Sequence, residues 1–177
     1  MIDWTMEYII SQVLVLMVYA CLIATYFQKK RMNILNTNVI AHFLQIVSFI
    51  LLHGLTGVFM NIFYIIRDSF LAIDYKNERK RSRKEDILII IIFLIIILVL
   101  SIISYNGWQS LLSILATIIS TIAIWQKSPK IYKALGIPTS LCWLGYNIFL
   151  KSVFAIILES ILLISTITGY LIERKRK

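Results

Sequence analysis

Long apolar runs dominate this chain of 177 residues and limit what it can fold into. The clearest run covers residues 87–100, which are all Ile, Leu, Val or Phe. Runs of about 17–21 residues recur along the sequence, and a helix of that length crosses a bilayer. Hydrophobic residues make up 59% of the chain and charged residues 15%, so a water-soluble fold would expose large apolar patches. The sequence therefore predicts an all-α integral membrane protein.

Seven spans can be placed, and helices are expected because lipid offers no partner for open strand edges. The expected spans cover residues 8–27, 34–52, 54–73, 87–104, 109–126, 134–150 and 152–172. Two connections are very short, at residues 53–54 and 150–152. A helix running through either turn would have about 40 residues, roughly twice what a hydrocarbon core of about 30 Å requires. Each pair is therefore expected to be two spans.

Basic residues indicate the orientation of these spans. If the N-terminus faces outside, only Lys151 lies on the outer side and Arg67 lies within a span, while the other 16 of the 18 Lys and Arg lie inside. This agrees with the positive-inside rule and predicts an N-out, C-in protein. The net charge of +9 then reflects topology, and no nucleic-acid partner is expected. The basic run at 76–84 is expected to anchor the inner side, with recognition of anionic inner-leaflet lipids as a second interpretation.

The first residues indicate whether the first apolar run is a cleaved signal peptide or a membrane span. Asp3 and Glu7 precede that run, which therefore lacks the basic start of a signal peptide. We expect the first run to be retained as a span.

A shift of 98 residues superimposes the first part of the chain on the last. It places residues 53–54 on 151–152 and Asn61 on Glu159. This predicts a first three-helix unit at 1–75, a basic loop and linker helix at 76–105, and a second unit with a basic tail at 106–177. Because one linker helix separates them, the two units are expected to be parallel repeats about an axis along the membrane normal. The linker is apolar all round, which suits a lipid-facing position.

Three stretches of the sequence resemble the bacterial inner-membrane YgjV family. They are Ser11-Gln12 with Phe27-Gln28-Lys29-Lys30-Arg31; His53-Gly54 with Gly57, Asn61 and Arg67; and Trp143-Leu144-Gly145-Tyr146-Asn147 with Lys151-Ser152 and Glu159. The resemblance covers nearly the whole chain and implies a multi-pass protein of the bacterial cytoplasmic (inner) membrane. It supplies a fold more than a function.

The 3+1+3 plan also resembles the SWEET/PQ-loop class of small-solute carriers. Those proteins carry a Pro-Gln pair that bends the first helix of each repeat. The expected spans 8–27 and 109–126 contain no proline, and Pro138 is the only proline within an expected span. The chain therefore departs from that class at the position of the bend.

Four residues are candidates for a substrate site near the middle of the membrane: Asn61, Trp143, Asn147 and Glu159. A carboxylate within a span costs about 2.5–3.5 kcal/mol on insertion scales and needs an explanation. Trp143 offers a face for stacking, and the amide and carboxylate groups offer hydrogen bonds. SWEET-like carriers, by resemblance, also use Trp and Asn in their central pocket. The alternative is that Asn61 and Glu159 are struts that hydrogen-bond between helices.

The other polar residues within spans are expected to have structural roles. Arg67 is expected to extend to the inner head groups, with an ion pair to Asp68 as the alternative. His42, which shares a helix face with Gln45, and His53 at the outer hairpin are expected to be helix-packing polar residues rather than metal ligands. The Ser and Thr side chains at 113, 117, 120 and 121 are expected to hydrogen-bond their own backbone.

Two functions remain open on these grounds. The first is a carrier of a small polar solute by alternating access; the alternative is a non-transporting membrane interaction or scaffold protein. No enzyme is expected, because the chain has no phosphate loop, nucleophile elbow or HExxH motif. Cys21 and Cys142 form no metal-binding spacing, and no cofactor is implied. The sequence leaves open the solute, the direction, the coupling ion and any homo-oligomer.

Overall fold

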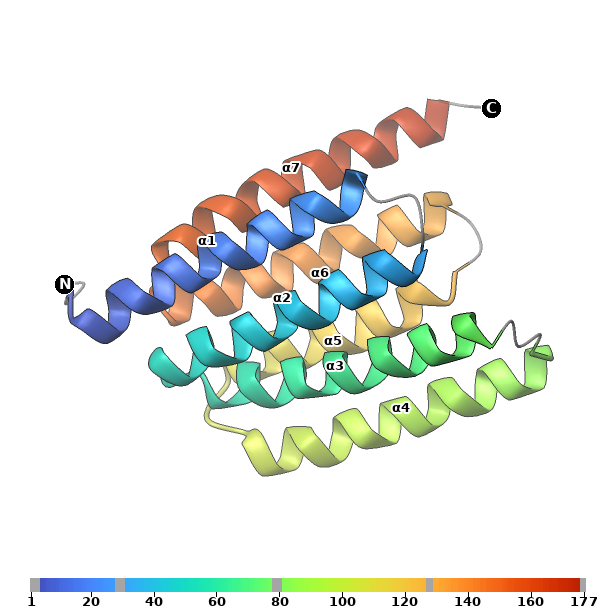
Figure 1. Ribbon diagram of the computed structural model, residues 1–177, viewed down its shortest axis with the longest axis horizontal. Helices are drawn as coiled ribbons and strands as arrows, with labels where there is room; N and C mark the ends of the chain where they lie inside the picture. The colour runs from blue at the N-terminus through green and yellow to red at the C-terminus, as the bar shows by residue number, and fades with distance from the viewer. Residues whose placement is uncertain (1–3, 28–30, 78–80, 127–128, 176–177) are drawn as a thin grey trace.

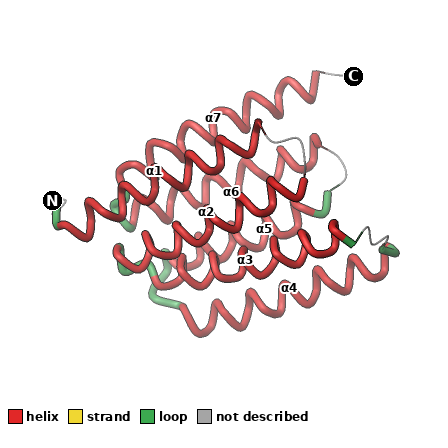
Figure 2. The backbone as a smooth tube through the Cα atoms, viewed as in Figure 1, coloured by secondary structure: helices red, strands yellow, loops and turns green. Residues whose placement is uncertain are grey.

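The structure, a computed structural model, describes residues 4–27, 31–77, 81–126 and 129–175, with residues 25–27, 31, 129, 130, 173 and 175 described in their backbone only. Within these residues every regular element is a helix, which confirms the all-helical prediction (Figures 1 and 2). The helices are α1 (Met6–Phe27), α2 (Arg31–Leu51), α3 (Leu55–Lys76), α4 (Arg83–Ser104), α5 (Ser110–Ile124), α6 (Pro129–Phe149) and α7 (Val153–Lys175).

Each of the seven expected spans coincides with one of these helices. Five helices, α1, α2, α3, α4 and α7, are long and apolar enough to cross a membrane. Helix α5 is apolar but has only 15 residues, and α6 has 21 residues with a more polar composition. Of the motif and inner-side residues singled out in the sequence, Gln28, Lys29, Lys30, Arg79, Lys80, Lys127, Arg176 and Lys177 lie outside the described residues.

Two tight turns separate α2 from α3 and α6 from α7, so neither pair is a single long helix. In the first turn, Gly54 N–H donates to Phe49 O and His53 N–H donates to Ile50 O. In the second, the same two hydrogen bonds run from residue 152 to 147 and from 151 to 148. This is the Schellman pattern, which ends a helix with one residue in the left-handed conformation. That residue is His53 (φ 55°) in the first turn and Lys151 (φ 54°) in the second.

Six of the helices form a closed ring. Neighbours in the chain pack side by side within α1–α2–α3 and within α5–α6–α7, and contacts of α1 with α7 and of α3 with α5 close the ring. Helix α4 lies outside it, against α3 and α5 (Figure 1). Only Phe93, Ile97 and Ser104 of α4 are buried, so most of its apolar surface faces outward, as expected for a lipid-facing helix.

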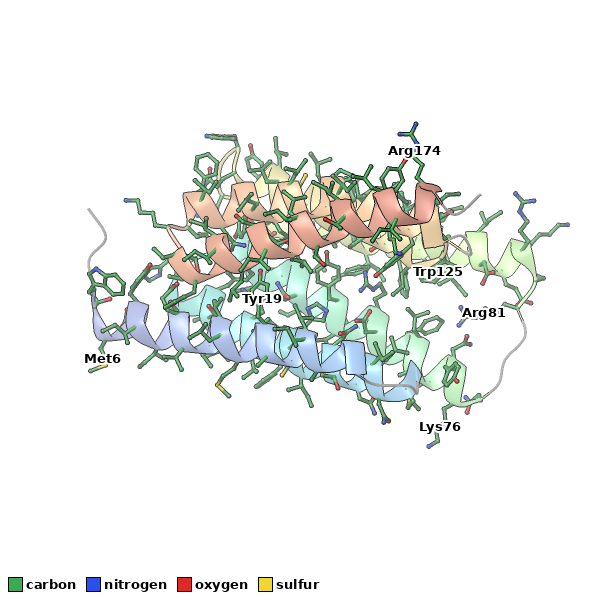
Figure 3. All side chains as sticks on the ribbon, turned by 90° about the horizontal axis from the view of Figure 1, so that it is seen from above. Met6, Tyr19, Lys76, Arg81, Trp125 and Arg174 are labelled. Carbon is green, nitrogen blue, oxygen red and sulfur yellow. The ribbon has the colours of Figure 1, made fainter. Side chains whose placement is uncertain are left out.

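The two ends of the ring differ in charge. We call the end with the turns at 52–54 and 150–152 the hairpin end, and the other the loop end. Figure 3 places Lys76, Arg81 and Arg174 at the loop end and Met6 at the opposite end. Helix α4 begins at the loop end with a capping box, in which Ser82 and Glu85 each accept a hydrogen bond from the other's backbone N–H.

Candidate functional site

A cavity of about 190 Å³ lies between α1, α2, α3, α6 and α7. All four residues predicted to bind a solute line it: Asn61 on α3, Trp143 and Asn147 on α6, and Glu159 on α7. Asn61, Asn147 and Glu159 are buried, and Trp143 is half-buried. The structure therefore brings side chains from both halves of the chain to one place within the ring.

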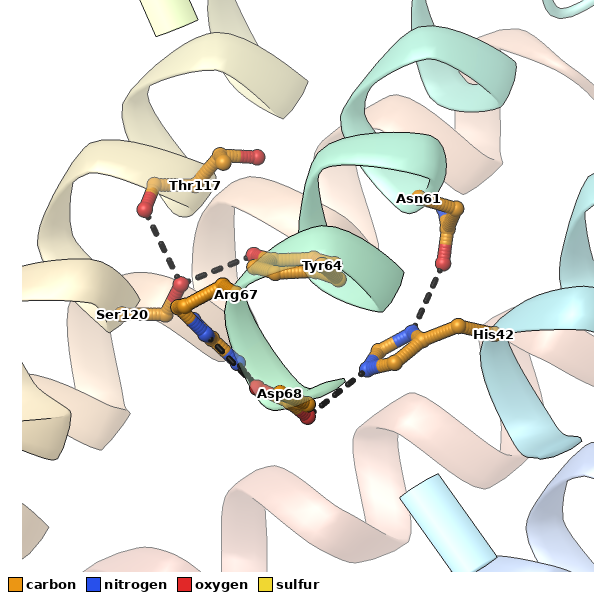
Figure 4. A network of polar contacts seen from close by, with 7 residues as sticks. All are labelled: His42, Asn61, Tyr64, Arg67, Asp68, Thr117 and Ser120. Atoms are coloured by element: carbon orange, nitrogen blue, oxygen red, sulfur yellow. Dashed lines mark hydrogen bonds and ion pairs between the residues drawn. The ribbon is translucent and has the colours of Figure 1, made fainter. Parts of the chain in front are cut away.

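Asn61 is held by two hydrogen bonds. Its Nδ2 donates to the Gly57 carbonyl in its own helix (2.9 Å), and its Oδ1 lies 2.9 Å from Nδ1 of His42 on α2 (Figure 4). Because the amide nitrogen already faces a carbonyl, Oδ1 is the acceptor and His42 Nδ1–H is the donor. His42 thus joins α2 to α3, as expected of a helix-packing polar residue.

On the other side of His42 from Asn61 lies a buried ion pair, Arg67–Asp68. Asp68 is fully buried, and its Oδ1 lies 2.8 Å from Nε and 2.7 Å from Nη2 of Arg67. Its Oδ2 has no hydrogen-bond partner and lies 3.6 Å from His42 Nε2, an ion-pair distance. Both ring nitrogens of His42 are therefore directed at oxygen atoms of α3 (Figure 4).

The expectation that Arg67 extends to the head groups is wrong. Its side chain is buried, and its guanidinium carbon lies 4.6 Å from the centre of the Tyr64 ring. The alternative ion pair forms because Asp68 is the adjacent residue and supplies the opposite charge. A buried charge without a partner would carry a desolvation cost of several kcal/mol.

Tyr64 connects the cavity wall to α5. Its hydroxyl donates to Ser120 Oγ (2.8 Å), which in turn donates to the Thr117 carbonyl (3.0 Å). Ser113 and Thr117 also donate to carbonyls of their own helix, which confirms the expectation for three of the four hydroxyl residues singled out from the sequence. It is wrong for Thr121, whose buried Oγ1 has no partner.

Glu159 links the two ends of the chain across the ring. The Tyr19 hydroxyl on α1 donates to its Oε2 (2.7 Å), and Ser140 on α6 is a second side-chain partner. Tyr19 and Ser140 also line the cavity. The carboxylate therefore both faces the cavity and bridges helices.

Aromatic rings form one wall of the cavity around Trp143. Phe49 on α2 stacks on it at 6.1 Å between ring centres with an interplanar angle of 13°. Tyr64 lies at 6.2 Å and Tyr146 at 5.9 Å. Such ring clusters are stabilising beyond their buried area by about 0.5–1.5 kcal/mol per pair. They hold the Trp143 ring in position beside the polar groups.

Asn147 lies one turn after Trp143 on the same helix and lines the same cavity. Its Oδ1 is buried and has no hydrogen-bond partner. An unsatisfied buried acceptor costs about 1–3 kcal/mol, so such atoms are uncommon in folded proteins.

Sequence reasoning missed the side chains that close the hairpin end. Gln12 Oε1 accepts from Phe154 N–H (3.0 Å), and the Tyr8 hydroxyl donates to the Lys151 carbonyl (2.9 Å). On the other side of the ring, the Tyr146 hydroxyl accepts from Gly57 N–H (2.8 Å). Each satisfies a group at a helix terminus that has no partner within its own helix. The sequence feature that could have indicated them is Gln12, a glutamine within an apolar run.

The described residues contain no group of three or more His, Cys, Asp or Glu side chains that could hold a metal ion. Among known proteins, no curated protein and no solved structure matches the chain. The family model for Imp-YgjV, bacterial inner membrane protein, matches residues 9–177. With this match over nearly the whole length, and with several helices able to span a bilayer, the chain belongs to the Imp-YgjV family of bacterial inner membrane proteins.

Proposed function

We propose that this inner membrane protein is a carrier of a small polar solute, working by alternating access at the cavity. The observation that carries the proposal is the meeting of Asn61, Trp143, Asn147 and Glu159 on one cavity of about 190 Å³ inside the ring. Polar groups inside a membrane are costly and commonly mark substrate or ion pathways.

The proposed moving parts are two parallel three-helix units, residues 1–75 and 106–177, joined by α4. Three observations support the repeat. A shift of 98 residues carries the bounds of α2 onto those of α6, and it carries the hydrogen bonds of the first tight turn onto those of the second. The same shift carries the pair His42–Asn61 onto Ser140–Glu159, which is also hydrogen-bonded.

The hydrogen bonds at the hairpin end suggest the gate. Tyr8 and Gln12 of the first unit bind residues 151–154 of the second, and Gly57 of the first binds Tyr146 of the second. In the proposed cycle these bonds close the outer side of the cavity and break when the units rock apart. SWEET-like carriers resemble this plan, although Pro138 is the only proline beyond the first turn of a described helix.

The proposal includes seven spans, with the N-terminus outside and the C-terminus inside. The loop end, with Lys76, Arg81 and Arg174, then faces the cytoplasm, where basic residues are retained and attract anionic inner-leaflet lipids. The short α5 and the more polar α6 are shielded by the rest of the ring on their inward faces. No enzymatic step is part of this function.

A second candidate, a non-transporting interaction protein, is favoured by one observation. Asn61 and Glu159 are each hydrogen-bonded to another helix, through His42 and Tyr19. Their role would then be that of interhelical struts, and the same substitutions that abolish transport in the first hypothesis would only weaken the fold.

Cysteine labelling separates the two candidates. In a Cys21→Ser, Cys142→Ser background, single cysteines replace Ala155 and Leu162, which line the cavity on α7, and Ile157 and Ile164, which are exposed on the same helix. A thiol reacts as thiolate, which forms in water and not in lipid. A carrier predicts labelling by a water-soluble reagent at 155 and 162 and protection at 157 and 164. Protection at all four positions supports the interaction protein.

Solute binding is then tested by thermal stabilisation of the purified protein with sugars, nucleosides, vitamins, amino acids and amines. A ligand that binds only the folded state stabilises it by about 2.7 kcal/mol at a hundredfold excess over Kd. A hit that Glu159→Gln and Trp143→Ala abolish, followed by flux of that solute into proteoliposomes, supports the carrier. Normal flux through both variants contradicts the site.

A further inference from the structure

The charges around the cavity are distributed unevenly. Glu159 is the carboxylate that lines it, and none of the described lining residues is Lys or Arg. Arg67 is neutralised by Asp68 and covered by the Tyr64 ring. The ring nitrogens of His42 are directed at Asn61 and Asp68. Glu159 is therefore the one acidic side chain among the described residues that line the cavity.

The aromatic rings of the cavity wall, like a carboxylate, present negative electrostatic potential to a ligand. Trp143 is flanked by Phe49 and Tyr64, and all three rings line the cavity. The face of an aromatic ring carries the negative part of its quadrupole and attracts cations, most strongly for Trp. An anion between these rings and Glu159 would meet repulsion from both sides.

One hydrogen-bonding group at the cavity is an acceptor without a donor, while several of the donors there are already used. Asn61 Nδ2 and His42 Nδ1 already donate within the protein, as does the Tyr19 hydroxyl to Glu159. Asn147 Oδ1, buried and without a partner, is an acceptor only. A ligand that supplies a donor and positive charge is matched by Asn147 Oδ1 and the Glu159 carboxylate.

From these three observations we infer that the carried solute is a small organic cation, a protonated amine or a quaternary ammonium ion. This inference rests on the carrier function proposed above and specifies its substrate class. The cation lies against Trp143, with Glu159 as its counter-ion and Asn147 Oδ1 as an acceptor for its polar substituent. The volume is adequate, because an apolar cavity of about 150 Å³ holds benzene and this one measures about 190 Å³.

Matched pairs of ligands test the inference. Choline is compared with 3,3-dimethyl-1-butanol, which has the same shape without charge, and ethanolamine with ethylene glycol. The first readout is thermal stabilisation of the full-length protein in detergent by each compound. The second is whether the neutral compound of each pair displaces the bound cation. We expect at least one cation to bind at least tenfold more tightly than its neutral partner.

Two variants locate the effect at the cavity. Glu159→Gln keeps the shape and removes the charge, and it should abolish the preference for the cation over its neutral partner. Glu7→Gln, at an exposed carboxylate in the first turn of α1, should leave it unchanged. If Glu159→Gln fails to fold, Trp143→Leu, which removes the ring but keeps an apolar side chain, should weaken cation binding about tenfold, and Trp143→Phe less than that.

The outcomes separate this inference from the carrier function. Binding of a neutral or anionic solute at the cavity, with cations no better than their partners, overturns the cation assignment and leaves the carrier standing. Cation preference that survives in both Glu159→Gln and Trp143→Leu also overturns it. Absence of binding by any solute class, together with protection of all four cysteines described above, overturns the carrier itself.

Discussion

The hydroxyl of Tyr19 on α1 lies 2.7 Å from Oε2 of Glu159 on α7 and donates a hydrogen bond to it. The two residues are 140 positions apart in the chain, yet this bond joins its first and last helices beside the cavity. A carboxylate at this depth depends on such donors, because lipid and apolar side chains supply none.

Replacement of Tyr19 by Phe tests this dependence. The variant keeps the ring and removes the donor, so we expect a loss of about 1.5–3 kcal/mol in the free energy of unfolding, the range for hydrogen bonds to charged groups. The measurement is reversible unfolding in mixed detergent. Tyr75→Phe, at an exposed tyrosine of α3, is the control and should change stability by less than about 0.5 kcal/mol. Equal stability of both variants would show that Glu159 does not need Tyr19.

Gly57→Ala should destabilise the contact between the two halves. A Cβ at Gly57 would lie 2.7 Å from Cδ2 of Phe49 and 2.9 Å from Cε1 of Tyr146. Overpacking of this kind commonly costs about 1–3 kcal/mol, and here it also strains the bond from Gly57 N–H to Tyr146.

Gly169→Ala on α7 is the matched control for that substitution. The nearest atom to its added Cβ would be Cδ of Lys133 at 3.8 Å, an ordinary contact with a flexible side chain. Removal of a glycine from a helix interior should stabilise by about 0.5–1 kcal/mol. The two alanine variants should therefore move the melting temperature in opposite directions, and a shift of the same sign would contradict the packing described for Gly57.

Single and double substitutions of the Arg67–Asp68 ion pair should differ in their effect on stability. Asp68→Asn leaves a buried guanidinium without its counter-charge, and breaking a buried pair costs about 3–5 kcal/mol. Arg67→Met alone leaves a buried carboxylate. The double variant removes both charges and should be more stable than either single variant. Where a single variant fails to fold, its level in the membrane fraction gives the same ranking, and a double variant no better than the singles would argue against an ion pair.

Relief of the left-handed conformation at the hairpin end should be stabilising. Lys151 has a φ of 54°, a conformation that costs a non-glycine residue about 1–2 kcal/mol. Lys151→Gly should therefore raise the free energy of unfolding by about 1 kcal/mol. Lys151→Ala removes the same side chain but keeps the strain, so it should bring no such gain. His53→Gly, at the equivalent turn with φ of 55°, should behave like Lys151→Gly.

The helices could be predicted from the sequence because each depends on local properties. Apolar runs mark their interiors, and the basic or turn-forming residues between them mark their ends. Bounds differ by a few residues, as at α6, which begins at Pro129 rather than at 134, since proline is well tolerated in a first helical turn.

Site residues were predictable only where a polar group was unusual for its surroundings. Asn61 and Glu159 stand out within apolar helices, and both line the cavity. Tyr19 and Ser140 do not, because tyrosine and serine are common in membrane helices and their role depends on which faces of α1, α6 and α7 meet. For Arg67, the neighbouring Asp68 was visible in the sequence, but whether the charge faced lipid or protein depended on the rotation of α3.

The bond between Gly57 N–H and the Tyr146 hydroxyl spans 89 residues and bears on how the protein is made. Helix α3 leaves the ribosome long before α6, so its first turn enters the membrane with that amide lacking its final acceptor. Tyr8 and Gln12 are synthesised earlier still, and their partners, residues 151–154, follow much later in the chain. The hairpin end is therefore completed last during biogenesis, and a chain truncated before α6 should be recognised by quality-control proteases as unfinished.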